Sequence, residues 1–296
     1  VIATLSWLFI GFTLVFAGLA IASIASNTKH TGGIIGYVEE HYGKKAAFLA
    51  GWYQVLVFIP LITGVLVTVL TDYALQLFGL TETIPVGSRF IIWVVVLLAV
   101  VGWNILSTRI ATLVSASATA IKVIPLILVA VLGITLGDPT QISNEAMDLG
   151  IEGVDFVKKS NLELFFAPML SMAFAFDGWV SVGALTVDME NPNRDFPKVI
   201  VGAILITTII YATYFFGVNA VMTNPAEIVA QGNAHVGTVA TTLFGPNGYT
   251  IVITCVVISV LGTLNANVMA GGRYVQKLGQ DGTLFMSEKF AAVEII

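Results

Sequence analysis

The sequence predicts an all-α integral membrane protein built as a helical bundle. Of its 296 residues, 57% are hydrophobic and 10% are charged, whereas a soluble domain carries about a quarter charged residues. The apolar residues gather in stretches of about 20, the length that a helix needs to cross a bilayer. The alternating pattern of a transmembrane barrel is absent from the sequence, and helices are then the structures that satisfy the backbone in lipid.

Seven apolar stretches are long enough to be spans, and we expect them to form one transmembrane domain over residues 1–296. They are 4–26, 47–70, 90–106, 112–136, 163–187, 198–222 and 248–270. The chain begins on an apolar residue that is not Met, and it ends on a segment that resembles the start of another apolar element. We therefore expect a fragment of a longer membrane protein.

Basic residues near the ends of spans indicate the orientation, because they stay preferentially on the cytoplasmic side. The loops after the first, third, fifth and seventh spans hold nine of them, namely Lys29, Lys44, Lys45, Arg109, Arg194, Lys198, Arg273, Lys277 and Lys289. The opposite loops hold three, namely Arg89, Lys158 and Lys159. The sequence therefore predicts that the first set of loops is cytoplasmic and that the chain begins on the outer side.

Two of the predicted inner segments have more character than a plain loop. Residues 30–52 mix glycines, aromatics and charges with apolar residues, which suits a short interfacial helix. An ordinary loop accounts for them equally well. Residues 187–198 combine an Asn-Pro turn with a Pro-Lys restart, which predicts a helix boundary.

The sequence argues against several other classes of protein. Cys255 is the sole cysteine, so an internal disulfide and a thiol cluster are excluded. His30, His41 and His235 show no metal-ligand spacing, and the spans hold neither a Ser/His pair nor paired carboxylates for catalysis. The 13 basic residues form no dense patch, which argues against a nucleic-acid partner. We predict no enzyme activity, no cofactor and no metal.

Two ionisable residues lie well inside the predicted spans, Lys122 in the fourth and Asp177 in the fifth. A charge at mid-bilayer costs at least about 2.5 to 3.5 kcal/mol, so each is a functional candidate. Small residues at 115–118 and 120 precede Lys122, and they would let another helix approach closely. The alternative is that Lys122 snorkels to an interface.

Asp177 lies beside Gly178, and Gly183 follows about a turn later. Glycine tolerates backbone geometries that other residues resist, so this segment can unwind. Freed carbonyls could then bind a cation or an ammonium group, and Asp177 could cap the second half-helix. A continuous, closely packed helix with Asp177 bonded to a neighbour accounts for the same residues. These residues alone do not decide between the two structures.

Residues 165–200 read FFAPMLSMAFAFDGWVSVGALTVDMENPNRDFPKVI. They resemble the sixth transmembrane helix and following loop of the amino acid/polyamine/organocation (APC) superfamily, in particular its L-type amino acid transporter branch. Residues 104–126 resemble the family's junction of helices four and five, with its helix-five lysine, and residues 261–282 resemble helix eight and the loop after it. The likeness covers essentially the whole chain and makes the seven spans family helices two to eight.

The resemblance implies the inverted five-helix-repeat transporter fold, truncated here at both ends, in which the first helix of each repeat is broken at mid-membrane. It favours a break in residues 163–187. It implies that the backbone carbonyls of Phe174, Ala175 and Asp177 accept the substrate's amino group, and that Phe174 closes over the substrate. The implied substrate-binding residues are Phe58, Ile62, Phe174, Ala175, Phe176, Asp177, Gly178 and Trp179.

The resemblance also assigns roles to the two intramembrane charges. Lys122 matches a lysine that occupies the place of a sodium ion in sodium-coupled relatives, and in helix eight it would reach Thr263 or Asn265. Several relatives have Gly where this chain has Asp177. We therefore expect the carboxylate of Asp177 to cap a half-helix and not to bind substrate.

The implied function is sodium-independent transport of L-amino acids, neutral ones in particular, across the plasma membrane by exchange or proton coupling with alternating access. The implied partners are the substrate, the bilayer and protons, and a single-span partner subunit or a homo-oligomer stays open. A seven-helix membrane receptor is the alternative class, and the missing extracellular cysteine pair argues against it.

Overall fold

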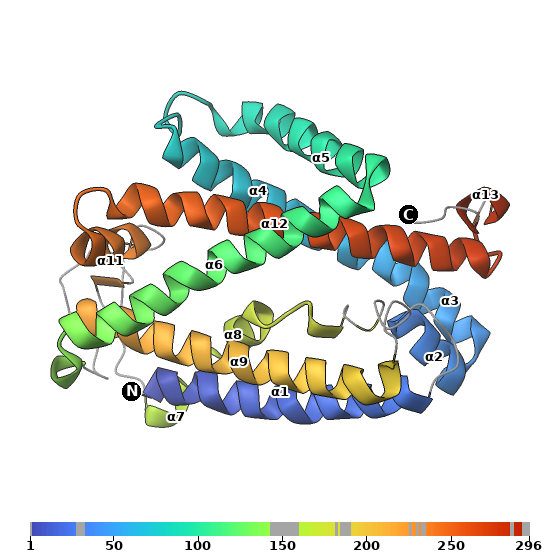
Figure 1. The fold of residues 1–296 in the computed structure, drawn as a ribbon, viewed down its shortest axis with the longest axis horizontal. Helices are drawn as coiled ribbons and strands as arrows, with labels where there is room; N and C mark the ends of the chain where they lie inside the picture. Colours follow the sequence, from blue (N-terminus) through green and yellow to red (C-terminus); the bar gives the residue numbers. More distant parts are fainter. Residues whose placement is uncertain are drawn as a thin grey trace. The chain divides into compact units, whose positions relative to one another are not determined.

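The computed structural model describes residues 2–27, 33–142, 160–180, 183, 191–224, 227–228, 231, 235–284 and 287–291. All regular structure in this part of the chain is helical (Figure 1), which confirms the predicted all-α class. The α-helices are α1 (Ile2–Asn27), α2 (Ile34–Tyr42), α3 (Lys44–Tyr53), α4 (Ile59–Leu77), α5 (Arg89–Leu106), α6 (Thr108–Leu136), α7 (Asn161–Phe166), α8 (Met169–Ala175), α9 (Pro192–Val221), α11 (His235–Phe244), α12 (Gly248–Gln280) and α13 (Ser287–Ala291). A π-helical turn, Gln54–Phe58, joins α3 to α4.

Six helical segments are long and apolar enough to cross a membrane, and they correspond to six of the seven predicted spans. They are Ile2–Ala25, Lys44–Leu77, Val86–Leu106, Ala111–Leu136, Arg194–Val221 and Gly248–Gln280. The second and the last extend further than the hydropathy pattern predicts, since their ends carry polar residues that a helix accommodates at a membrane surface.

The predicted fifth span, residues 163–187, is not one continuous helix. Its described part consists of the short helices α7 and α8, and α8 ends at Ala175. Pro168 lies between the two helices, where its missing N–H removes a helical hydrogen bond. Residues 184–190 lie outside the described part of the chain. The prediction of an interrupted helix is therefore confirmed at Ala175, and the interruption at Pro168 is an additional one.

The two inner segments contain helix starts. Residues 30–52 include α2 and most of α3, so the helical alternative holds for the described residues of this stretch. α9 begins at Pro192, in agreement with the predicted Asn-Pro boundary and six residues before the predicted span. The carbonyl of Asn191 accepts the N–H groups of Arg194 and Asp195 at 3.1 and 2.9 Å.

The chain divides into two compact units. Unit 1 comprises Val1–Leu19, Val123–Asp177 and Lys198–Ile253, and unit 2 comprises Ala20–Lys122, Gly178–Pro197 and Thr254–Ile296. The boundary between Asp177 and Gly178 falls within the interrupted segment, and the boundary after Lys122 falls within α6. Each unit is described by itself below.

Small residues bring the helices of unit 1 close together. In this unit α1 lies along α9 (Figure 1), where Gly11 faces the side chain of Thr208. α6 packs on α9 through backbone contacts: a Cβ added to Gly133 would lie 2.5 Å from the carbonyl oxygen of Gly217. The N–H of Asp138 also donates to the carbonyl of Ala220 at 2.8 Å. Close backbone approach through glycine is typical of helix association in membranes.

Replacement of Gly217 by alanine should destabilise the protein. A Cβ there would lie 2.8 Å from the carbonyl oxygen of Val129 and 2.9 Å from that of Ala130, so α6 and α9 must separate, at a cost of about 1 to 3 kcal/mol. Gly202→Ala on the same helix is the matched control, because a Cβ there meets nothing within 4 Å. Thermal unfolding of the detergent-solubilised variants measures the difference. Equal midpoints for the two variants would contradict the close contact.

The core of unit 2 is formed by α4, α5 and α12. Val67 and Leu70 of α4, Val100 of α5 and Leu264 of α12 are buried together. A second cluster joins Ile35 of α2 to Tyr274 of α12. Beside it, the ammonium group of Lys277 binds Glu39 at 3.1 Å and Asp281 at 2.5 Å. α2 is therefore fastened to the end of α12 by apolar packing and by an ion pair.

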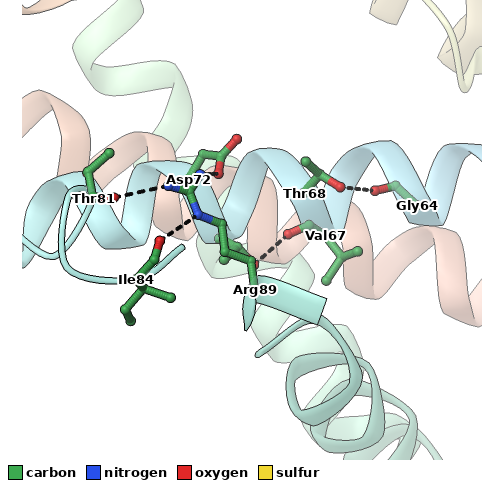
Figure 2. A network of polar contacts seen from close by, with 8 residues as sticks. Gly64, Val67, Thr68, Asp72, Thr81, Ile84 and Arg89 are labelled. Carbon is green, nitrogen blue, oxygen red and sulfur yellow. Dashed lines mark hydrogen bonds and ion pairs between the residues drawn. The ribbon is translucent and has the colours of Figure 1, made fainter. Parts of the chain in front are cut away.

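The connection between α4 and α5 is closed by Arg89, as Figure 2 shows. Its guanidinium pairs with Asp72 at 2.8 Å and donates to the carbonyls of Thr81 at 3.1 Å and Ile84 at 3.3 Å. The side chain of Arg89 is only 14% exposed. Arg89 thus holds the turn between two helices, and its hydrogen-bonding capacity is largely used within the fold.

Candidate functional site

The interrupted helix ends in a tight turn. The N–H of Phe176 donates to the carbonyls of Met172 and Ala173, both at 3.2 Å, and the N–H of Asp177 donates to that of Phe174 at 3.0 Å. Gly178 follows with φ +102°, a backbone conformation that glycine adopts without the strain imposed by a Cβ. The glycine that predicted the break is therefore the residue that makes the turn possible.

The turn leaves backbone carbonyls without helical partners, because a helix end always does so. The carbonyl of Ala175 accepts a hydrogen bond from the hydroxyl of Tyr211 on α9 at 3.2 Å. A carbonyl oxygen has two lone pairs, so Tyr211 leaves capacity for a second donor. Ala175 thus presents an acceptor of the kind that binds an ammonium group.

An aromatic cluster in unit 1 supports this end of α8. Phe176 is 6% exposed, and its ring centroid lies 5.9 Å from that of Trp7 and 5.3 Å from that of Tyr211. Trp7 also contacts Tyr211 and Phe215, at 5.3 and 6.5 Å. Sequence reasoning did not select Trp7, Tyr211 or Phe215. Aromatic residues at helical spacing, such as 211 and 215, have the pattern of ordinary core residues.

The other residues of the turn are exposed within their units. Phe174 is 60% exposed, and Asp177 and Gly178 are exposed as well. Among the described residues, the carboxylate of Asp177 accepts no hydrogen bond, and residues 181–182, where a capped N–H group would lie, are outside the described ranges. The capping role of Asp177 stays a prediction. Trp179 begins a short 3-10 turn in unit 2 and is half-buried.

Phe58 and Ile62 lie in unit 2, at the junction of the π-helical turn and α4. The N–H of Ile59 donates to the carbonyl of Gln54, five residues back, and Pro60 has no N–H to donate. The missing donor accounts for the widening of the helix here. π-helical turns occur frequently at functional sites, and sequence reasoning predicted Phe58 without predicting this turn.

Lys122 belongs to a face of α6 that packs against α12 in unit 2. On that face Ser115 hydrogen-bonds Asn265, and Ala118 contacts Gly262. Lys122 lies seven residues beyond Ser115, about 10 Å further along the helix axis. Lys122 is half-buried. Within the described residues, no hydrogen bond or ion pair involves its ammonium group.

The amide of Asn265 uses all of its hydrogen-bonding capacity elsewhere. Its oxygen accepts from the indole of Trp103 at 2.6 Å and from Asn104 at 2.7 Å. Its nitrogen donates to the carbonyl of Ala111 and the hydroxyl of Ser115, both at 2.7 Å. Asn265 is fully buried and joins α12 to α5 and α6.

Thr263 is the other predicted partner of Lys122 on α12. It is exposed within unit 2, and its hydroxyl donates to the carbonyl of Ser259 at 3.0 Å. Its oxygen therefore keeps capacity to accept a hydrogen bond. Of the two predicted partners, Thr263 is the one with an acceptor to offer. Where the structure is described, no group of three His, Cys, Asp or Glu side chains could hold a metal ion.

Comparisons with known proteins place this geometry in a family. The family model described as amino acid permease matches residues 1–294. The serine/threonine exchanger SteT of Bacillus subtilis is 30% identical over 294 residues, which cover 98% of this chain and 63% of the exchanger. The human large neutral amino acids transporter small subunit 2 is 26% identical over 96% of this chain and 52% of its own length.

The mouse b(0,+)-type amino acid transporter 1 is 22% identical over 97% of the chain and 57% of its own length. The chain thus spans between about half and two thirds of the length of these relatives. The proteins that it resembles are transporters, which sets aside both the enzyme class and the receptor alternative. With a match over essentially its whole length, the chain belongs to the amino acid permease family.

Proposed function

We propose that the protein transports neutral L-amino acids across the plasma membrane without sodium, by exchange or by proton coupling. The observation that carries this proposal is the interrupted helix that ends at Ala175, with Gly178 at positive φ, in a member of the amino acid permease family. Broken membrane helices expose backbone groups that bind ions and charged parts of substrates. An amino acid offers such a group in its ammonium.

In this proposal the carbonyls of Phe174, Ala175 and Asp177 accept hydrogen bonds from the substrate ammonium. Tyr211 holds the Ala175 carbonyl through its hydroxyl, and Phe176 fixes the turn by packing against Trp7 and Tyr211. Backbone carbonyls stay neutral whether or not substrate is bound. They therefore bind an ammonium group without leaving a buried charge behind when the substrate departs.

The substrate side chain would contact Phe58 and Ile62, which are both apolar and half-buried. An apolar contact of this kind favours neutral side chains, since a charged one would lose its hydration without a partner. Lys122 would supply a fixed positive charge in place of sodium, with Thr263 as its acceptor on α12. The substrate's movement through the membrane would then need no sodium ion.

Uptake by the full-length protein in proteoliposomes tests the proposal. Radiolabelled neutral amino acids should enter in a saturable way that unlabelled neutral amino acids compete for and that removal of sodium leaves unchanged. Preloading with unlabelled substrate should accelerate uptake if transport is by exchange, and an inward proton gradient should do so if it is proton-coupled. Uptake that neither saturates nor responds to competition would overturn the proposed function.

The human relative is named as a small subunit, and we include a single-span partner subunit among the proposed partners of this chain. Mass spectrometry of the protein purified from its native membrane tests this point. A stoichiometric single-span protein is expected, and its absence at full transport activity would argue that the chain works without one.

Replacement of Phe174 by alanine should raise the KM for amino acid uptake by about tenfold. A ring that closes over the substrate contributes the burial of a large apolar side chain, and tenfold corresponds to about half of such a burial. Phe166→Ala is the matched control, because Phe166 on α7 is 53% exposed against 60% for Phe174. An unchanged KM in Phe174→Ala would remove this residue from the site.

A further inference from the structure

Two rows of side chains meet where α4 packs against α12 in unit 2. On α12, Asn267 donates from its amide to the hydroxyl of Thr63 at 2.8 Å and to the carbonyl of Ile59 at 3.4 Å. Gly271, one turn along α12, lies against the side chain of Ile59, where an added Cβ would be 3.0 Å away. The row formed by residues 267 and 271 therefore covers the row formed by residues 59 and 63.

The row on α4 that α12 holds is directly adjacent to the predicted contact surface for the substrate side chain. Phe58 and Ile62 are four residues apart, as are Ile59 and Thr63, so each pair forms a row along one face. The two rows differ by one residue, or about 100° around the helix. A movement of the row held by Asn267 must therefore move Phe58 and Ile62 with it.

The helix is also able to move at this point. Phe58 is the last residue of the π-helical turn and Pro60 follows at the second position of α4, so the regular hydrogen bonding that would fix Phe58 is interrupted. An interruption of this kind needs support from neighbouring elements to hold one conformation. The Asn267 amide supplies that support from outside the helix, through two acceptors one turn apart.

We propose that Asn267 is a positioning residue that sets substrate selectivity, because it fixes the Phe58 and Ile62 surface through Thr63 and Ile59. This inference rests on the proposed function. Without the tether, the surface is free to recede from the substrate. Bulkier neutral side chains should then be accommodated better relative to small ones, with the change in KM and not in kcat.

Selectivity measurements on the reconstituted full-length protein test the role of Asn267. We expect Asn267→Leu and Thr63→Val each to raise the ratio of kcat/KM for leucine to that for alanine by about fivefold, the factor that an ordinary hydrogen bond provides. The double variant should show no larger shift than the greater of the two, since both remove the same contact. Thr63→Val preserves the shape of the side chain, so folding should be retained.

Two variants serve as controls for the hydroxyl group. Thr63→Ser keeps the hydrogen bond and should keep the wild-type ratio. Thr68→Val makes the same replacement on α4 at a hydroxyl that donates only to the carbonyl of Gly64 in its own helix at 2.8 Å (Figure 2), and it should also leave the ratio unchanged.

The outcomes separate this inference from the proposed function. If the wild-type protein transports amino acids and both Asn267→Leu and Thr63→Val keep its ratio within about twofold, the role of Asn267 is overturned and the proposed function stands. A shift in Thr63→Ser as large as that in Thr63→Val would overturn the role of the hydrogen bond. Absence of wild-type uptake would overturn both.

Discussion

Replacement of Lys122 by alanine is expected to lower amino acid uptake at least about tenfold, while the protein still inserts and folds. An ammonium group in a membrane span costs about 2.5 to 3.5 kcal/mol even by insertion measurements, and alanine removes that cost. Stability should therefore not fall. A loss of transport without a loss of folded protein is the result that a functional charge predicts and that a structural charge does not.

The location of Lys122 is the reason why the loss should be large. It lies on the face of α6 whose preceding residues, Ser115 and Ala118, contact Asn265 and Gly262 of α12. A fixed charge at the end of such a contact can bind groups that move during transport, in the way that a sodium ion does in coupled carriers. A tenfold loss corresponds to one interaction of about 1.4 kcal/mol, which is small for a charge in a membrane.

Uptake per folded molecule is the measurement, with the amount of protein in each liposome preparation determined by fluorescence size exclusion. Lys45→Ala is the matched control, because Lys45 is exposed at the start of α3 and should leave uptake unchanged. Lys122→Arg keeps the charge with a different geometry and should retain part of the activity. Uptake by Lys122→Ala at the wild-type rate would refute the role of this residue.

The membrane-length helices could be predicted from the sequence because their cause is local. A helix that faces lipid must be apolar over its whole length, so the composition of each stretch indicates a span without knowledge of its neighbours. The break at Ala175 could also be predicted, because Gly178 allows the helix to unwind and the resemblance of residues 165–200 to a broken family helix favours that structure. The interruption at Pro168 carried a sequence signal too, the proline itself.

The contacts within the candidate site could not be predicted in the same way. Tyr211 and Trp7 contact the end of α8 from helices far away in the sequence, and no local pattern distinguishes them from core aromatics. Asn265 was selected through the family resemblance as a partner for Lys122. The structure reveals that its amide is already occupied by α5 and α6, which depends on how three helices pack.

Replacement of Asn265 by leucine should destabilise the fold by about 2 to 4 kcal/mol. Leucine has a similar volume, but it leaves the indole N–H of Trp103, the amide of Asn104, the carbonyl of Ala111 and the hydroxyl of Ser115 without their partner. Each such group costs about 1 to 3 kcal/mol in a buried site, and polar contacts between membrane helices average below that. The expected sum lies between these limits.

A matched asparagine on α9 separates the loss of contacts between helices from the loss of an amide. Asn219 is also buried, but its amide donates only to the carbonyl of Phe215 in its own helix at 2.8 Å. Thermal unfolding in detergent should therefore show a fall of about 4 °C or more for Asn265→Leu and a much smaller one for Asn219→Leu. Equal falls would mean that burial alone sets the cost, and that the hydrogen bonds from Asn265 to α5 and α6 add nothing to stability.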